Sequence, residues 1–114
     1  MDVLSEQEFR TKSVEALEDA RRALLPLADT GDGFEVELQN GVLNLVFEEP
    51  SEMKFVVSPN APVRQIWVSA MARSYKLAWT PALNAFALDG ETLPQLLDRL
   101  ARQFLDAVRG ARTS

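Results

Sequence analysis

Apolar positions in residues 4–28 recur at the spacing of an α-helix. Ser5 and Glu8 form a capping-box pattern at the start of this stretch, in which each side chain can satisfy a backbone N–H of the first turn. The apolar stripe predicted to face the core comprises Phe9, Val14, Leu17, Ala20, Leu24 and Leu27. Pro26 lacks a backbone N–H and would clash with the preceding turn, so we expect the helix to end or distort near Leu25.

The middle of the chain alternates between apolar and polar positions, which is typical of strands with one face in water. Five strands are predicted, at residues 34–39, 43–47, 53–58, 64–69 and 74–79. Residues 86–88 could form a short sixth strand. Asn40-Gly41 predicts a tight hairpin turn, because both residues tolerate positive φ. Short connections between successive strands favour an antiparallel meander.

A second helix is predicted to begin at Thr92, which forms another capping box with Gln95 and tolerates Pro94 in its first turn. Its apolar stripe comprises Leu93, Leu96, Leu97, Leu100, Phe104 and Val108. The order helix, strands, helix predicts an α+β fold: a two-layer sandwich with both helices on one face of a five- to six-stranded antiparallel sheet. Residues 1–114 are expected to form one domain, with a short disordered tail from about residue 110.

Composition narrows the chemistry that this chain can perform. The 114 residues are 46% apolar, as in globular proteins, and include no cysteine and no histidine. Disulfides, thiolate zinc sites, cysteine-held iron–sulfur clusters and histidine-held haem are therefore excluded, and so is an imidazole base. Any metal must be bound by oxygen ligands. No apolar run approaches the ~20 residues of a membrane span, and the N-terminus lacks signal-peptide features, so we expect a soluble intracellular protein without a membrane partner. These features do not identify a compartment, and our expectation for it is the cytoplasm.

The net charge of −5 is unevenly distributed along the chain. Residues 1–52 hold thirteen acidic and four basic residues, a net charge of −9, whereas residues 53–114 carry a net charge of +4. An acidic first half argues against nucleic acid as a partner, because phosphates would be repelled. It favours cations or a basic protein surface, although the acids could serve only to keep the domain soluble.

One group of carboxylates is predicted to share a rim of the molecule, which we call the acidic ridge. Its members lie on the first helix, in the following loop and on the wet face of the first strand: Glu15, Glu18, Asp19, Asp29, Asp32, Glu35 and Glu37. Such a cluster would bind a hard cation weakly, with several waters retained. The alternative is an ordinary solvated helix face, because Arg22 can form ion pairs with Glu18 and Asp19 that would compete with a metal.

The strand at 64–69 carries the second candidate site. Gln65, Trp67 and Ser69 alternate with apolar residues and should point away from the helices, onto the open face of the sheet. A tryptophan beside charged Arg64 and Arg73 has the composition of a binding hot spot. The alternative is that Trp67 simply lies flat over its neighbours and covers part of that face.

Four segments together resemble the frataxin family. They are Asn40-Gly41-Val42-Leu43, the strand motif at residues 62–69, Ser74-Tyr75-Lys76, and Asp89-Gly90-Glu91-Thr92-Leu93 at the entry to the last helix. The likeness runs from about Leu4 to Phe104, without large gaps, and the order of the pieces matches the family.

The resemblance implies an α–β sandwich that is not an enzyme and has no tightly bound organic cofactor. It implies weak binding of iron (Fe2+/Fe3+) on the ridge, where Glu15, Glu18, Asp29, Asp32 and Glu35 fall at or near family positions and Asp19 adjoins them. It implies two partners for a monomer: a cysteine desulfurase that meets the ridge and an iron–sulfur scaffold protein that meets Gln65 and Trp67. Where the family's first helix usually carries further carboxylates, this sequence has Arg22, Leu25 and Pro26, so the ridge holds fewer of them. A non-metal interaction module on the same fold is the alternative, and a ferroxidase is disfavoured because neither histidine nor closely spaced carboxylates are evident.

Overall fold

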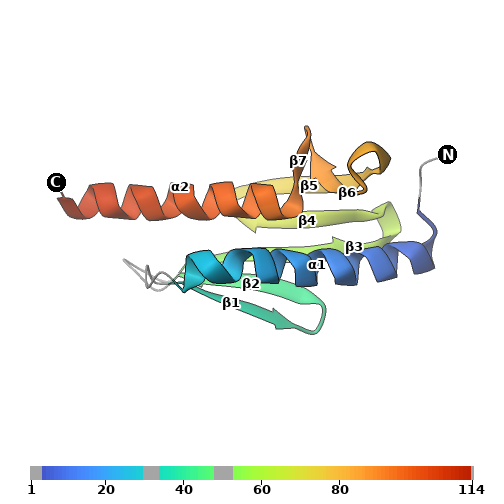
Figure 1. The fold of residues 1–114 in the computed structure, drawn as a ribbon, viewed down its shortest axis with the longest axis horizontal. Helices are drawn as coiled ribbons and strands as arrows, with labels where there is room; N and C mark the ends of the chain where they lie inside the picture. The colour runs from blue at the N-terminus through green and yellow to red at the C-terminus, as the bar shows by residue number, and fades with distance from the viewer. Residues whose placement is uncertain (1–3, 30–33, 48–52, 114) are drawn as a thin grey trace.

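A seven-stranded antiparallel sheet with two helices on one face forms the molecule (Figure 1). The computed structural model describes residues 4–29, 34–47 and 53–113, with side chains up to residue 108. The elements in chain order are α1 (Glu6–Ala28), β1 (Phe34–Gln39), β2 (Val42–Phe47), β3 (Met53–Asn60), η1 (Ala61–Val63), β4 (Gln65–Ala70), β5 (Arg73–Thr80), η2 (Pro81–Leu83), β6 (Ala85–Leu88), β7 (Glu91–Thr92) and α2 (Leu93–Thr113).

The predicted α+β sandwich is confirmed, and the sheet follows chain order from β1 to β7 as a meander. The predicted strand count was too low, because β7 is only two residues long and cannot show a period. The fourth strand begins at Gln65 rather than at Arg64, since Arg64 adopts the left-handed conformation (φ 54°) that ends the η1 turn.

The first helix begins as predicted and ends later than predicted. The Ser5 N–H donates to Glu8 Oε1 at 3.0 Å, and the Glu8 N–H donates to Ser5 Oγ at 3.1 Å, which completes the capping box. The helix then continues through Pro26 to Ala28, so the expected end near Leu25 was wrong. Pro26 is exposed, while Leu27 and Ala28 pack against the core, and this packing offsets the one backbone hydrogen bond that proline removes.

The buried stripe of α1 also differs from the prediction at one position. Val14 is 67% exposed, whereas Ser13 is 3% exposed. The Ser13 hydroxyl donates to the Arg10 carbonyl oxygen at 3.0 Å, so burying it leaves no unsatisfied polar group. The core face of α1 therefore follows Phe9, Ser13, Leu17, Ala20 and Leu24.

The core between the sheet and the helices is centred on Phe47, which is fully buried. Its ring centroid lies 4.9 Å from that of Phe34, 4.8 Å from that of Phe55 and 4.7 Å from that of Phe104. These four side chains come from β1, β2, β3 and α2, so a single aromatic cluster joins the edge of the sheet to the last helix.

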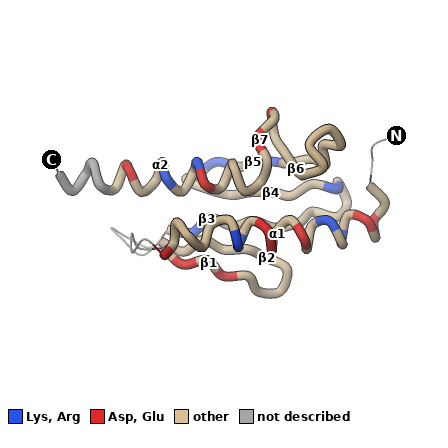
Figure 2. Tube along the Cα trace, in the orientation of Figure 1, with Lys and Arg blue, Asp and Glu red and all other residues tan. Residues whose placement is uncertain are grey.

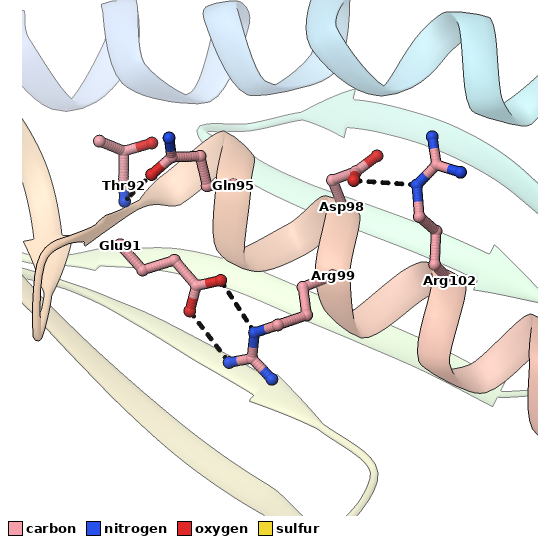
Figure 3. Close-up of polar contacts among 6 residues, drawn as sticks. All are labelled: Glu91, Thr92, Gln95, Asp98, Arg99 and Arg102. Atoms are coloured by element: carbon pink, nitrogen blue, oxygen red, sulfur yellow. Dashed lines mark hydrogen bonds and ion pairs between the residues drawn. The ribbon is translucent and has the colours of Figure 1, made fainter.

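Polar contacts hold the start of α2 against the sheet (Figure 3). The Thr92 N–H donates to Gln95 Oε1 at 3.0 Å, which is one of the two hydrogen bonds of the predicted capping box. Arg99 forms a bidentate ion pair with Glu91, in which Nε donates to Oε2 at 2.8 Å and Nη2 donates to Oε1 at 3.0 Å. This hydrogen bonding lowers the pKa of the Glu91 carboxyl. The helix itself runs to Thr113, whereas the sequence predicts disorder from about residue 110. Arg109, Ala111 and Arg112 are good helix formers, whereas Gly110 is the residue in this segment that most disfavours a helix.

The hairpin between β4 and β5 turns through two residues that both adopt left-handed conformations, Met71 (φ 50°) and Ala72 (φ 63°). Replacing Ala72 with glycine is expected to raise the free energy of unfolding by about 0.5–1 kcal/mol, because glycine adopts this conformation without strain. Urea denaturation followed by circular dichroism measures the change.

The same substitution in a helix supplies the control for Ala72. Ala107 is exposed on α2, and Ala107→Gly should lower the free energy of unfolding by about 1 kcal/mol. If both glycine variants lose stability to the same extent, the turn holds no strain that glycine relieves.

Within the described ranges, neither helix combines the length and the apolar character that a membrane crossing requires.

Candidate functional site

The open face of the sheet presents the predicted tryptophan at its middle strand. Residues paired across antiparallel strands share a face, and Trp67 of β4 pairs with Ser58 of β3 and Lys76 of β5. Gln65 and Ser69 lie on the same side of β4, while Ile66 and Val68 are buried beneath the helices. The prediction that Gln65, Trp67 and Ser69 face away from the helices is confirmed.

Two neighbours hold the Trp67 side chain in place. The indole Nε1–H donates to Gln65 Oε1 at 2.9 Å, and the Lys76 Nζ lies 4.9 Å from the ring centroid. The residue remains 36% exposed. Trp67 thus covers part of the open face and still exposes apolar surface beside a cation. A side chain held in this way is preorganised for contact with a partner.

Arg64 and Arg73, which the sequence associates with Trp67, lie elsewhere. The Arg64 Nε donates to the Leu4 carbonyl oxygen at 3.3 Å, and its Nη1 donates to the Ala61 carbonyl oxygen. Arg64 therefore joins the η1 turn to the chain just before α1. Arg73 is exposed but pairs with buried Ala70, which places it on the helix side of the sheet.

Lys76 is the cation that the sequence analysis missed. A two-residue turn at Met71-Ala72 pairs Ala70 with Arg73 and, counting back along both strands, Trp67 with Lys76. The signal was therefore available from the length of the turn. Proximity in sequence indicated Arg64 and Arg73, whereas hairpin register decides which side chains are neighbours in a sheet.

On α1, the carboxylates of the acidic ridge are partly neutralised by arginines of the same helix. Arg21 Nη2 lies 2.6 Å from Glu18 Oε1, and its Nε lies 3.3 Å from Oε2. Arg22 lies 3.5 Å from Glu18 and 3.5 Å from Asp19, in agreement with the predicted pairing. The hydrogen bond from Arg21 is the main reason that the pKa of Glu18 is lowered. Arg21 was missed in the sequence analysis, although its i,i+3 spacing from Glu18 indicated it.

The remaining ridge positions that the structure describes lie along one edge of the molecule but point to different faces of the sheet. Glu35 and Glu37 are exposed on β1 and point to the open face, because Phe34 on the alternate register is buried. Glu15 and Asp29 are exposed on α1 and at its C-terminal cap. Asp32 lies outside the described residues. Figure 2 shows acidic positions along α1 and β1, two elements that run along the same edge of the molecule.

This arrangement makes the ridge a negatively charged surface and not a metal cage. Across residues 4–29, 34–47 and 53–108, no three acidic side chains come close enough to hold a metal ion together. Separated carboxylates can attract a cation that keeps its own hydration shell, or they can face a basic protein surface. The metal-binding role of the six proposed ligands stays a prediction.

Comparison with known proteins agrees with this architecture. Residues 2–107 match the family model of the frataxin-like domain, so the chain belongs to the frataxin-like family, as its motifs indicated. It is 34% identical over 76 residues to the iron–sulfur cluster assembly protein CyaY of Cupriavidus metallidurans, an alignment that covers 66% of this chain and 67% of that protein. The frataxin from Psychromonas ingrahamii has the same fold, with a TM-score of 0.68, 13% identity and 93% of each chain covered.

Proposed function

We propose that this protein regulates iron–sulfur cluster assembly by binding a cysteine desulfurase and its scaffold protein, without catalysing a bond change itself. Membership of the frataxin-like family is the observation that carries the proposal, together with the name of the Cupriavidus relative as a cluster assembly protein. The chain has no cysteine and no histidine, so the sulfur chemistry would belong to its partners. We place this role in the cytoplasm and expect the protein to act as a monomer.

The open face is the surface that we assign to the scaffold protein. Trp67 lies at its centre, with Gln65 and Lys76 in direct contact with the ring. A large aromatic side chain that is already held in one position loses little conformational entropy on binding. This supports Trp67 as the anchor of that interface.

The acidic ridge is the surface that we assign to the desulfurase. The acidic residues of α1 and β1 give this side of the molecule a negative field, which would steer a basic protein surface toward it. Iron would bind to the same carboxylates weakly and with most of its waters retained, because the described residues provide no closed set of ligands.

A non-metal interaction module on the same fold is the second candidate. The observation in its favour is the pairing of Glu18 with Arg21 and Arg22, and of Asp19 with Arg22, which occupies two of the proposed ligands. Under this reading, the ridge serves protein contacts alone.

Calorimetric titration with a cysteine desulfurase, with and without the scaffold protein, tests the proposed function. We expect binding that weakens as ionic strength rises, because exposed charges are screened by salt. Failure of the intact protein to bind either partner at low salt would remove the partner assignment.

Replacing Arg21 and Arg22 with glutamine is expected to strengthen Fe2+ binding about fivefold, because Glu18 and Asp19 lose the cations that compete with the metal. NMR shifts at the ridge carboxylates during an anaerobic Fe2+ titration report the affinity. Arg102→Gln is the matched control, since Arg102 pairs with Asp98 on α2 and should leave the titration unchanged. A ridge that stays silent in both variants favours the non-metal module.

A further inference from the structure

A pocket of about 270 Å³ lies between α1, the η2–β6 segment and the start of α2. It is on the flank of α1 that faces α2, whereas β1 lies on the other flank. Its walls combine aromatic and charged side chains, among them Lys12, Glu15, Asp19, Trp79 and Phe86. We call it the Trp79 pocket, and neither the scaffold face nor the β1 part of the ridge contributes to it.

The aromatic wall of this pocket is rigid and already faces a cation. The Trp79 and Phe86 ring centroids are 5.3 Å apart in an edge-to-face arrangement, and Phe86 packs in the same way against buried Phe9 at 5.7 Å. Trp79 is only partly buried, and the Lys12 Nζ lies 5.5 Å from its ring centroid. The ring is therefore fixed from behind and presents its π-system to positive charge.

Of the two carboxylates of the pocket, one has no ion pair within the described residues and the other has a single, exposed ion pair. Glu15 is exposed and forms no ion pair with any of the described residues. The Asp19 side chain is 64% exposed, and Arg22 approaches it only at 3.5 Å. Two carboxylates against one lysine leave the pocket with an excess negative charge, which disfavours anions and favours a second cation.

We propose that the Trp79 pocket receives the guanidinium group of an arginine presented by a partner protein, and that Lys12 occupies the ring face in its absence. A guanidinium is planar, so it can stack on the indole, and its N–H fork can reach two carboxylates together, whereas an ammonium is a point charge. Arrival of the arginine would displace Lys12 from Trp79. The pocket shares Glu15 and Asp19 with the ridge that we assign to the desulfurase, but the proposal needs neither iron nor the Trp67 face, and a short peptide tests it without that partner.

The peptide acetyl-Gly-Arg-Gly-amide is the probe, and the indole N–H signal of Trp79 in a 1H–15N NMR titration is the readout. The protein has two tryptophans, so the Trp67 signal serves as an internal reference. We expect a saturable shift of Trp79 alone. The same peptide with citrulline, which is neutral, should give no saturable shift, and the lysine peptide should bind several-fold more weakly.

Variants of the pocket test the roles of its charges. Lys12→Met should tighten binding of the arginine peptide about threefold, because the competing cation is lost. Glu15→Gln with Asp19→Asn should weaken it about fivefold. Equal shifts with the citrulline peptide, a lysine peptide as tight as the arginine one, or weaker binding by Lys12→Met would each overturn the proposal. The desulfurase titration uses the unsubstituted protein, so its failure and the failure of the peptide titration are distinguishable.

Discussion

Replacing Trp67 with alanine is expected to weaken binding to the scaffold protein about 30-fold or more, which corresponds to about 2 kcal/mol. The ring lies on the middle strand of the sheet, and Gln65 and Lys76 hold it in place before any partner arrives. Truncation would remove both the apolar contact and the preorganised cation beside it. Calorimetry with the scaffold–desulfurase complex measures the loss.

Ser69→Ala is the matched control, because Ser69 is exposed on the same face of the same strand. It should leave the affinity within about twofold. Trp67→Ala should also retain a cooperative unfolding transition, since the side chain faces away from the core and contributes little to it. If the alanine variant bound as tightly as the parent, Trp67 would only cover the sheet.

Replacing Phe47 with alanine is expected to lower the free energy of unfolding by about 3–5 kcal/mol. The side chain is fully buried, and it contacts the rings of Phe34, Phe55 and Phe104. Deleting it would leave a cavity where the edge of the sheet meets α2. A loss of this size is a large part of the about 5–15 kcal/mol that stabilises a typical domain. Urea denaturation and the thermal midpoint both report it.

Val14→Ala provides the contrast within the same experiment. The sequence pattern assigns Val14 to the core, but its side chain is 67% exposed. The substitution should therefore change the free energy of unfolding by no more than about 0.5 kcal/mol. A large loss at Val14, or a loss below about 1 kcal/mol at Phe47, would mean that the described core is wrong in this region.

The sequence predicted the helices and most of the strands because each carries a local signal. The capping box at Ser5 and Glu8, the alternation in β1 and β2 and the Asn40-Gly41 turn depend only on residues close together in the chain. The end of α1 at Pro26 was predicted wrongly for the opposite reason, since Leu27 and Ala28 pack against a core built from distant parts of the chain.

The candidate sites were predicted less completely. The period of β4 was enough to place Trp67 and Gln65 on the open face. The neighbours of these side chains were not predicted, because strand register sets which residues are adjacent across a sheet. The register places Lys76 beside Trp67, where Arg64 and Arg73 were expected. The Trp79 pocket had no sequence signal, since its walls come from segments about 60 residues apart.

By itself, the sequence determined the α+β class, the frataxin-like family and the side of the sheet on which Trp67 lies. It also determined that any metal must be bound by oxygen ligands. Helical spacing also indicated the ion pairs of Arg21 and Arg22 with the α1 carboxylates. Only the tertiary structure decided which charges meet between different elements: it placed Lys76 over Trp67 and Lys12 over Trp79. The physical reason is that periodicity specifies which way a side chain points, whereas packing of distant segments specifies what it finds there.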